Sequence, residues 1–272
     1  MNAKLLAQRC LFALATMMIV ARVATAVEQP TASGSQPQAA ARTEEPGDQV
    51  DPRATQILRR ACSVLADSHA FTFHAEINFD QVMPSEVKLQ FAGASDFAVR
   101  RPNALAVDYE SDLGAKRLWY NGKTLTIFDA PTMTYASTPV PPSIDGMLES
   151  VAEMHNLTIP LADLALSNPC EKISNKILFG SYVGVGDVGG VACDHLAFAQ
   201  SNVDWQIWIQ RSGKPLPRKV VINYRTTPGL PQYAAVISDW KFPGTIPNAR
   251  FAIQIPKKAV RIRIVDVKEP HP

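Results

Sequence analysis

Six residues of the chain, Gly184-Val-Gly-Asp-Val-Gly189, have the glycine spacing of a dinucleotide-binding loop. Such a loop binds a pyrophosphate only where a helix follows at once, because the N–H groups at the start of that helix contact the phosphates. Here Gly190 is followed by residues 191–198, which are typical of a strand. We therefore interpret the six residues as a glycine-rich hairpin turn, and we expect no cofactor.

The five histidines lack the spacing of a metal or catalytic site. Two zinc ligands on one helix face stand four residues apart, which no pair of these histidines does, and the chain has no Cys-x-x-Cys motif. Asp194 and His195 are adjacent on a predicted strand, so their side chains point to opposite faces and cannot form an acid–base pair. A Gly-x-Ser-x-Gly nucleophile motif is also absent. We therefore predict no metal site and no enzymatic activity.

The cysteines constrain the fold only if the chain is exported. After removal of the leader described next, Cys62, Cys170 and Cys193 remain, which allows one disulfide and a spare thiol, or no disulfide. Cys62 lies on the apolar stripe of a predicted helix, and we interpret it as a small buried residue. Cys170 and Cys193 flank a predicted hairpin, and we expect them to be the pair if one forms.

The first 26 residues have the order of a signal peptide. Lys4 and Arg9 accompany an apolar run over residues 10–21, and Ala24 and Ala26 supply the small side chains that precede a cleavage site. The run is shorter than the roughly 20 residues that a membrane-spanning helix needs. We predict cleavage after Ala26 and export to the periplasm.

The rest of the chain divides into a linker and one domain. Residues 27–48 are rich in Pro, Gln, Ser and Ala and contain too few large apolar side chains for a core, so we predict a flexible linker. Residues 49–272 are enough for a single all-β domain. The chain has 27 basic and 25 acidic residues, and this balance predicts no nucleic-acid partner.

Alternating apolar and polar residues dominate the domain. Residues 71–80 alternate without exception, which is typical of a half-buried strand. We expect further strands at 87–91, 96–100, 105–109, 117–120, 124–129, 133–137, 177–183, 192–199, 204–210, 218–225, 233–240 and 260–264.

Helices are expected at two places in this pattern. Asp51 and Pro52 suit the start of a first helix, and Ser143 can cap a second helix, with a short apolar segment at 159–166 after it. Helices before and between runs of strands predict a mainly β, α+β fold: a single curved antiparallel sheet with the helices on its concave side.

Residues 100–135 resemble the LolA-type periplasmic lipoprotein carriers. Arg101-Pro102 precedes a strand, and Asn121-Gly-Lys-Thr-Leu125 then forms a hairpin that Phe128-Asp129 follows. The opening helix and residues 71–79 are also similar to that family. The second half, with the Asp194-His195 pair and two tryptophans, resembles more closely a group of predicted periplasmic proteins of unknown function.

This resemblance implies an open half-barrel with an apolar concave face and helices that act as a lid. It also implies that Arg101 bonds to the lid and helps to hold it closed; the alternative is that Arg101 simply ends an exposed strand. The cysteines, the Asp194-His195 pair and the two tryptophans are not shared with the carriers, so lipoprotein transport in particular does not follow.

We therefore predict a periplasmic protein whose concave face binds a lipid, an acyl chain or a lipoprotein. Burial of each methylene contributes about 0.8 kcal/mol, so one acyl chain is enough for useful affinity. Alternation selects the candidate lining residues Phe73, Ile77, Leu89, Phe91, Leu105, Val107, Leu118, Met147, Leu148, Val151 and Trp205.

Other interpretations remain open. Trp205 and the helix at 143–155 can equally belong to a filled core of a purely structural domain. The same fold can serve as an envelope-stress sensor or regulatory module that binds an envelope membrane protein. A hydrolase that uses His195 is a further alternative.

Overall fold

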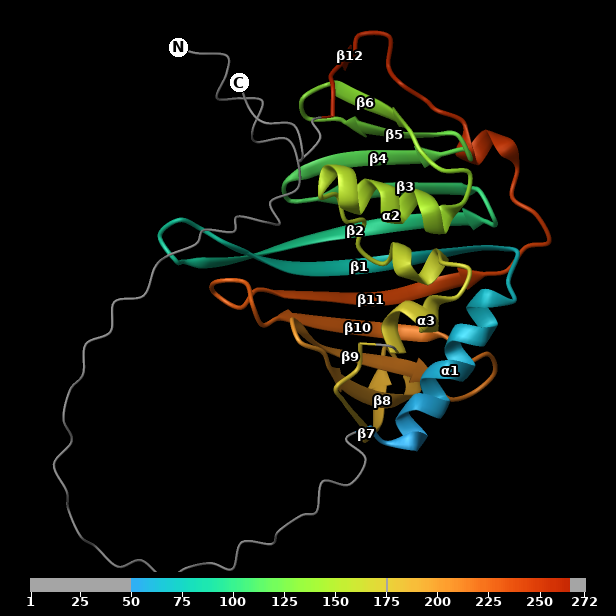
Figure 1. Cartoon of the computed structure of the whole chain (residues 1–272), viewed down its shortest axis with the longest axis vertical. Coiled ribbons are helices and arrows are strands. Elements are labelled where there is room, and N and C mark those ends of the chain that lie inside the picture. Colours follow the sequence, from blue (N-terminus) through green and yellow to red (C-terminus); the bar gives the residue numbers. More distant parts are fainter. Residues whose placement is uncertain (1–49, 175, 265–272) are drawn as a thin grey trace, which may run out of the picture. The chain divides into compact units, whose positions relative to one another are not determined.

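The computed structural model describes residues 50–174 and 176–264, and the predicted signal peptide and linker lie outside this part of the chain. Within these residues the chain forms one large sheet and a few short helices (Figure 1). In the described residues we find no helix with the length and apolar character that would let it cross a membrane.

The sheet has twelve strands in the order β12-β6-β5-β4-β3-β2-β1-β11-β10-β9-β8-β7. Neighbouring strands are antiparallel, except that the two-residue β12 runs parallel to β6. The strands are β1 (Ala70–Val82), β2 (Lys88–Arg100), β3 (Ala104–Ser111), β4 (Gly114–Tyr120), β5 (Thr124–Asp129), β6 (Thr134–Pro139), β7 (Phe179–Val188), β8 (Val191–Ala199), β9 (Val203–Gln210), β10 (Pro217–Tyr224), β11 (Gln232–Lys241) and β12 (Val260–Arg261).

The helices begin where the sequence predicts them. The Asp51 side chain accepts a hydrogen bond from the N–H of Arg53 and caps α1 (Pro52–Ala66), and the Ser143 hydroxyl caps α2 (Ile144–His155) in the same way. The apolar segment at 159–166 contains the short 3₁₀ helix η3 (Ala162–Ala165). Two short elements have no counterpart in the prediction: α3 (Pro169–Ser174) and the 3₁₀ helix η4 (Asn248–Phe251).

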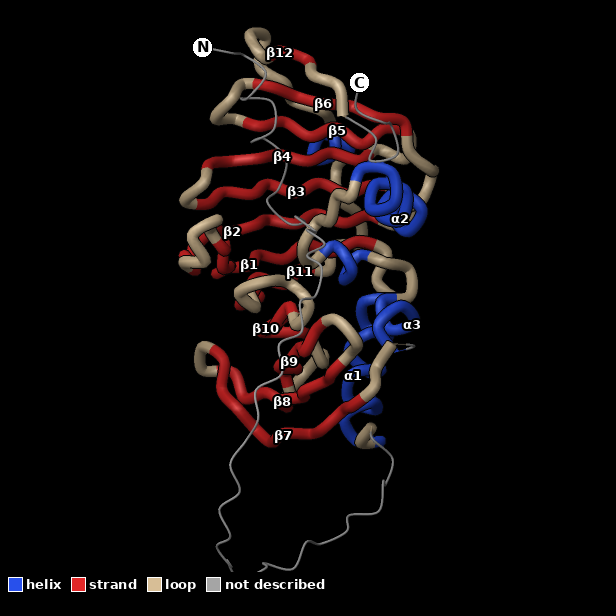
Figure 2. The backbone as a smooth tube through the Cα atoms, turned by 60° about the vertical axis from the view of Figure 1, so that its left-hand side comes forward, coloured by secondary structure: helices blue, strands red, loops and turns tan. Residues whose placement is uncertain are grey.

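The sheet is curved, and α1, α2 and α3 lie on one side of it (Figure 2). It does not close into a barrel, since β12 and β7 are its two edges. The predicted fold class, an open half-barrel with helices on the concave face, is confirmed.

Each face of the sheet has its own apolar core. The concave core is the larger and contains side chains of β1–β5 and β8–β11 packed against α1, α2 and η3. The convex core is small: alanines of β1, β2 and β3, together with Trp119 and Phe128, pack against Ile246 and Phe251 of the carboxyl-terminal segment. The two-residue side-chain period of each strand separates the two cores.

The glycine-rich segment is a hairpin turn, as predicted. Val188 pairs with Val191, and Gly189 and Gly190 form the turn with φ angles of 59° and 81°. Positive φ at both central residues suits the type of turn that matches strand twist, and only glycine adopts it without strain.

Candidate functional site

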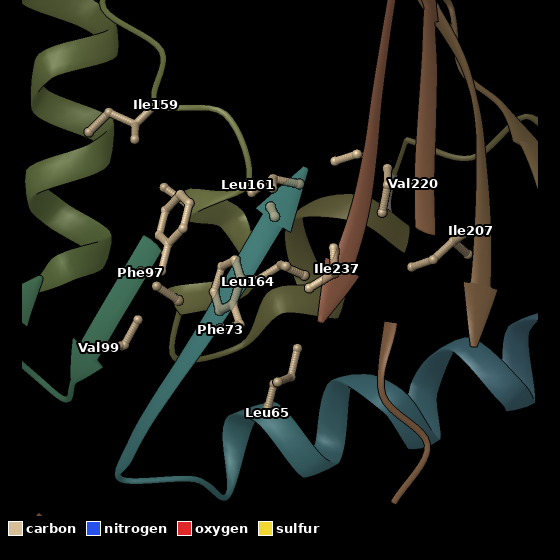
Figure 3. Close-up of a cluster of buried hydrophobic side chains, with 14 of the residues drawn as sticks. Leu65, Phe73, Phe97, Val99, Ile159, Leu161, Leu164, Ile207, Val220 and Ile237 are labelled. Carbon is tan, nitrogen blue, oxygen red and sulfur yellow. The ribbon is translucent and has the colours of Figure 1, made fainter. Parts of the chain in front are cut away.

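The helical segment between β6 and β7 covers much of the concave face, and we call residues 144–174 the lid. Figure 1 shows α2, η3 and α3 in front of the strands, with the hairpin of β1 and β2 projecting beyond them at one end. Ile159, Leu161 and Leu164 of the lid are buried. In Figure 3 these three side chains lie among Phe73, Phe97, Ile237 and other sheet residues.

Most of the predicted lining residues belong to this concave core. Eight are buried: Phe73, Ile77, Leu105, Val107, Leu118, Met147, Val151 and Trp205. Leu148 is half-buried and packs against the same core, and Phe91 is half-buried in contact with Phe79, with 5.7 Å between ring centroids. The structure therefore brings the strand residues of this set to the concave face, and Met147, Leu148 and Val151 of α2 belong to the same core.

Leu89 is the exception among the predicted lining residues. It pairs with Gln81 in the part of the β1–β2 hairpin that extends past β3 and β11, and it is 41% exposed. Leu89 shares the strand face of Phe91 but lies beyond the neighbouring strands, because alternation continues along a strand past the point where its neighbours end. Its contact with a ligand stays a prediction.

Arg101, which follows β2, connects the sheet to the lid. Its guanidinium donates hydrogen bonds of 2.6 Å to the carbonyls of Leu65 and Ser68, which end α1. It also donates to Leu166 at 2.6 Å and to Leu164 at 3.5 Å, both in the lid. Burial lowers the pKa of Arg101, and the charge of Asp145 opposes that shift. The side chain thus contacts the lid as the resemblance implies.

Other polar contacts reinforce the same end of the lid. The N–H of Ile144, at the start of α2, donates to the carbonyl of Pro102 at 2.8 Å. The Asp145 carboxylate accepts hydrogen bonds from the backbone and the hydroxyl of Ser167, the latter at 2.8 Å. Sequence reasoning missed both contacts, because they join residues that no local pattern relates.

The disulfide joins Cys62 of α1 to Cys170 of α3, with 5.7 Å between the Cα atoms. The predicted pair of Cys170 and Cys193 is therefore wrong. Cys170 lies on a helix that packs against α1, whereas Cys193 is held in β8 between Gly186 and Gln210. Cys193 is buried and is a free thiol in the part of the chain that the structure describes, and burial raises its pKa.

One transverse row of the concave face crosses six strands at the end nearest the projecting hairpin. Strand register places the following side chains side by side in it: Phe91, Phe79, Tyr233, Ile222, Trp205 and Phe198. Tyr233 and Trp205 are each 7% exposed, yet among the described residues neither the Tyr233 hydroxyl nor the Trp205 indole N–H has a hydrogen-bond partner.

Further tyrosines lie near this row. Burial raises the pKa of Tyr109 on β3 and of Tyr224 on β10, and the charge of Asp163 in η3 adds to the shift of Tyr224. The pKa of Tyr233 is raised by burial and, to a smaller extent, by Tyr224 and Tyr109. The raised pKa keeps each of the three phenols protonated, so that each can donate a hydrogen bond.

His195 belongs to the opposite side of the sheet. Its ring stacks on Trp208 with 4.0 Å between centroids, and Nε2 lies 2.9 Å from the Gln206 amide oxygen. Asp194 contacts the Tyr182 hydroxyl at 3.1 Å and Arg211 at 3.3 Å instead. The adjacent aspartate and histidine thus have separate partners.

A hollow of about 480 Å³ lies between the sheet edge and the end of α2. It is lined by Ser137, Thr138, Met154, His155, Arg261, Ile262, Arg263 and Ile264. The described residues contain no group of three or more His, Cys, Asp or Glu side chains that could hold a metal ion.

Solved structures that resemble this one include three bacterial proteins. An uncharacterized conserved protein from Thermus thermophilus has a TM-score of 0.47 and 11% identity, covering 78% of this chain and 99% of its own. Lipoprotein LppX from Mycobacterium tuberculosis has a TM-score of 0.45 and 13% identity, with 72% and 100% coverage. A LolA superfamily protein from Nitrosomonas europaea has a TM-score of 0.36 and 12% identity, with 74% and 97% coverage. These distant likenesses assign no ligand.

Family membership rests on a different comparison. No curated protein matches the chain. A family model described as a predicted periplasmic protein (DUF2092) matches residues 54–265, which include the whole sheet and the lid. That description agrees with the predicted periplasmic location and with the predicted group of unknown function. The chain therefore belongs to the DUF2092 family of predicted periplasmic proteins.

Proposed function

We propose that this periplasmic protein binds an acyl chain, as a lipid or as part of a lipoprotein, on the concave face of its sheet. The observation that carries the proposal is the way the lid occupies that face. Residues 157–161 contribute three buried apolar side chains, Leu157, Ile159 and Leu161, to the concave core. Such side chains can be replaced by an acyl chain without leaving polar groups unpaired.

Burial of the lid side chains and burial of an acyl chain contribute free energies of similar size. Full burial of an aliphatic side chain contributes about 1.5–3 kcal/mol, so Leu157, Ile159 and Leu161 together contribute roughly 4.5–9 kcal/mol. An acyl chain of about fifteen methylenes contributes about 12 kcal/mol when it is buried, at about 0.8 kcal/mol per methylene. A single chain is therefore sufficient to offset displacement of these lid residues from the sheet.

The backbone of the lid is strained at Leu161. Leu161 has a φ of 64°, in the left-handed region that residues with a Cβ rarely adopt. Such a conformation costs on the order of 1–3 kcal/mol and persists only because surrounding contacts impose it. Burial of the Leu161 side chain is one such contact, so displacement of the lid releases this strain.

Arg101 is proposed as the residue that holds the lid in place. It joins the end of α1 to residues 164–166 through hydrogen bonds from a charged group, which are stronger than those between neutral groups. In this role Arg101 fixes residues 164–166 beside α1, and through them it sets how readily residues 157–161 leave the concave face and how long a ligand stays bound.

The test is purification of the full chain from the periplasm without detergent, followed by native mass spectrometry and lipid extraction. We expect an acyl species in a ratio of about one per protein molecule. A protein that is free of acyl species, and that also fails to take up long-chain lipids offered to it afterwards, would contradict the proposal. Recovery of an envelope membrane protein without any lipid would favour the regulatory alternative.

A further inference from the structure

Two buried donors on the concave face have no partner in the closed protein. The Tyr233 hydroxyl and the Trp205 indole N–H are buried without a hydrogen bond to any described residue. A buried polar group left unsatisfied loses its hydrogen bonds to water without replacement, and proteins therefore rarely retain one without a use. Two of them in a single row of side chains call for an explanation.

The position of the two donors relates them to one another and to the lid. Ile222 of β10 pairs with Tyr233 of β11 on one side and with Trp205 of β9 on the other, so all three side chains share a face. Tyr233 and Trp205 also belong to the same buried apolar core as Ile159, Leu161 and Leu164 of the lid. Displacement of the lid would therefore expose the donors to an entering ligand.

Other polar side chains on the concave face do have hydrogen-bond or ion-pair partners. The Tyr120 hydroxyl is also buried, and it donates a 2.7 Å hydrogen bond to the carbonyl of Pro141, just before α2. Lys116 of β4 is paired with Asp129 of β5. Tyr233 and Trp205 differ from these residues because no described residue accepts a hydrogen bond from their donors.

The chemistry of the row limits the kind of acceptor. All six of its side chains are uncharged, and a buried anion without a countercharge is strongly unfavourable. Trp is a donor only, and a protonated Tyr donates well. The matching ligand group is therefore an uncharged oxygen acceptor.

We propose that Tyr233 and Trp205 donate hydrogen bonds to the carbonyl of an acyl ester, so that the protein selects esterified chains over free carboxylates and over chains without a carbonyl. This inference rests on the proposed function, since it needs the acyl chain to lie on the concave face. A free glycerolipid and the diacylglyceryl group of a lipidated peptide both carry this chemistry.

The experiment compares two ligands that differ only at the carbonyl. Dipalmitoylglycerol and its ether analogue dihexadecylglycerol are delivered to the full chain from cyclodextrin complexes, and binding is followed by calorimetry. We expect the ester to bind more tightly, with a difference of roughly 2- to 12-fold for each neutral hydrogen bond. A dipalmitoylated lipopeptide forms a third arm, and a tighter ester-dependent affinity for it than for dipalmitoylglycerol would identify a lipoprotein as the source.

The variant Tyr233→Phe assigns the effect to the hydroxyl. It should weaken ester binding by roughly 2- to 12-fold, leave ether binding unchanged, and keep or raise the melting temperature of the free protein. Tyr120→Phe is the matched control, which should lower the melting temperature because it removes a satisfied hydrogen bond. An infrared shift of the ¹³C-labelled ester carbonyl should appear with the wild-type chain and diminish with Tyr233→Phe and with Trp205→Phe.

The outcomes separate the two proposals. Tight and equal binding of ester and ether by the wild-type chain would overturn the ester selection and leave the acyl-binding function in place. A marked loss of melting temperature in Tyr233→Phe would assign the hydroxyl a structural role and would also overturn the selection. Failure of the wild-type chain to bind either lipid would overturn the proposed function, and the ester selection with it.

Discussion

The two ends of the lid's central segment are held to the sheet in different ways. Residues 164–170, the anchored part, are fixed by Arg101, by the Asp145–Ser167 contact and by the disulfide to Cys62. Residues 157–161, the apolar part, contribute buried side chains to the concave core, and Asn156 ends α2 with a φ of 49° immediately before them. One part is held by directional and covalent contacts, and the other mainly by burial.

This difference indicates which part can move. Hydrogen bonds to a charged group contribute about 1.5–3 kcal/mol each and are lost abruptly when the geometry changes. Burial of apolar surface is non-directional, so an acyl chain can take the place of the apolar part at little net change in free energy. The anchored part then acts as the fixed end about which the apolar part leaves the sheet.

The largest expected effect comes from the disulfide. The double variant Cys62→Ala/Cys170→Ala removes a link across a sequence separation of 108 residues. We expect a loss of about 2–5 kcal/mol in the free energy of unfolding, measured by urea denaturation. Cys193→Ala is the control for a buried cysteine that forms no disulfide, and an equal loss in that variant would show that the link does not anchor the lid.

Arg101, which contacts the lid, is next compared with its neighbour Arg100, which lies on the convex side. Arg101→Leu leaves buried carbonyls of α1 and of the lid without a donor, so we expect a loss of roughly 3 kcal/mol in stability and a faster dissociation of bound lipid. The neighbouring Arg100 instead donates to Ile246 and lies over the Phe251 ring on the convex side. Arg100→Leu should therefore lower stability but keep the ligand off-rate, and an unchanged off-rate in Arg101→Leu would count against the proposed role.

The apolar part should show opposite effects on stability and on binding. Ile159→Ala removes part of a side chain that competes with the ligand, so we expect the free protein to lose about 2 kcal/mol of stability while its lipid affinity rises. Ile246→Ala in the convex core should lower stability alone. Calorimetric binding curves for both variants test this, and weaker binding in Ile159→Ala would mean that the lid encloses the ligand rather than competing with it.

A histidine on the convex side should make stability depend slightly on pH without changing lipid affinity. His74 lies on the convex side of β1 with Nδ1 2.8 Å from Asp96, and this hydrogen bond raises the pKa of the histidine above 6.5. The contribution of this hydrogen bond to the free energy of unfolding is complete below pH 6.5. It is lost as the pH rises through the raised pKa of His74 in the folded protein. Because the pair is partly exposed, we expect less than about 1 kcal/mol. Melting temperatures of wild type and His74→Gln from pH 5 to 9 measure it, and lipid affinity should not follow the same curve.

Local sequence patterns predicted the faces of the strands and the starts of the helices. Phe73, Val107 and Trp205 were assigned to one face because successive strand residues alternate between faces whatever the rest of the chain does. Alternation did not reveal that Leu89 lies beyond β3, since the point at which neighbouring strands end is not encoded in the alternation. The cap residues Asp51 and Ser143 act within two or three residues and were equally predictable.

The site itself depends on contacts between distant residues. Cys170 finds Cys62 only because α3 packs against α1, and α3 has no periodic pattern of sufficient length. The lid residues Ile159 and Leu161 lie in an irregular segment, where apolar character alone does not reveal which surface they cover. The missing partner of Tyr233 is a property of its surroundings, although its alternation with Ala235 and Ile237 marks the face to which it belongs.

Amide hydrogen exchange of the free and the dipalmitoylglycerol-bound protein tests most directly whether the apolar part gives way to the ligand. We predict that residues 157–161 exchange faster in the bound state, while residues 164–170 keep their protection and the strands under the lid gain it. Unchanged or stronger protection of residues 157–161 in the bound state would contradict the account.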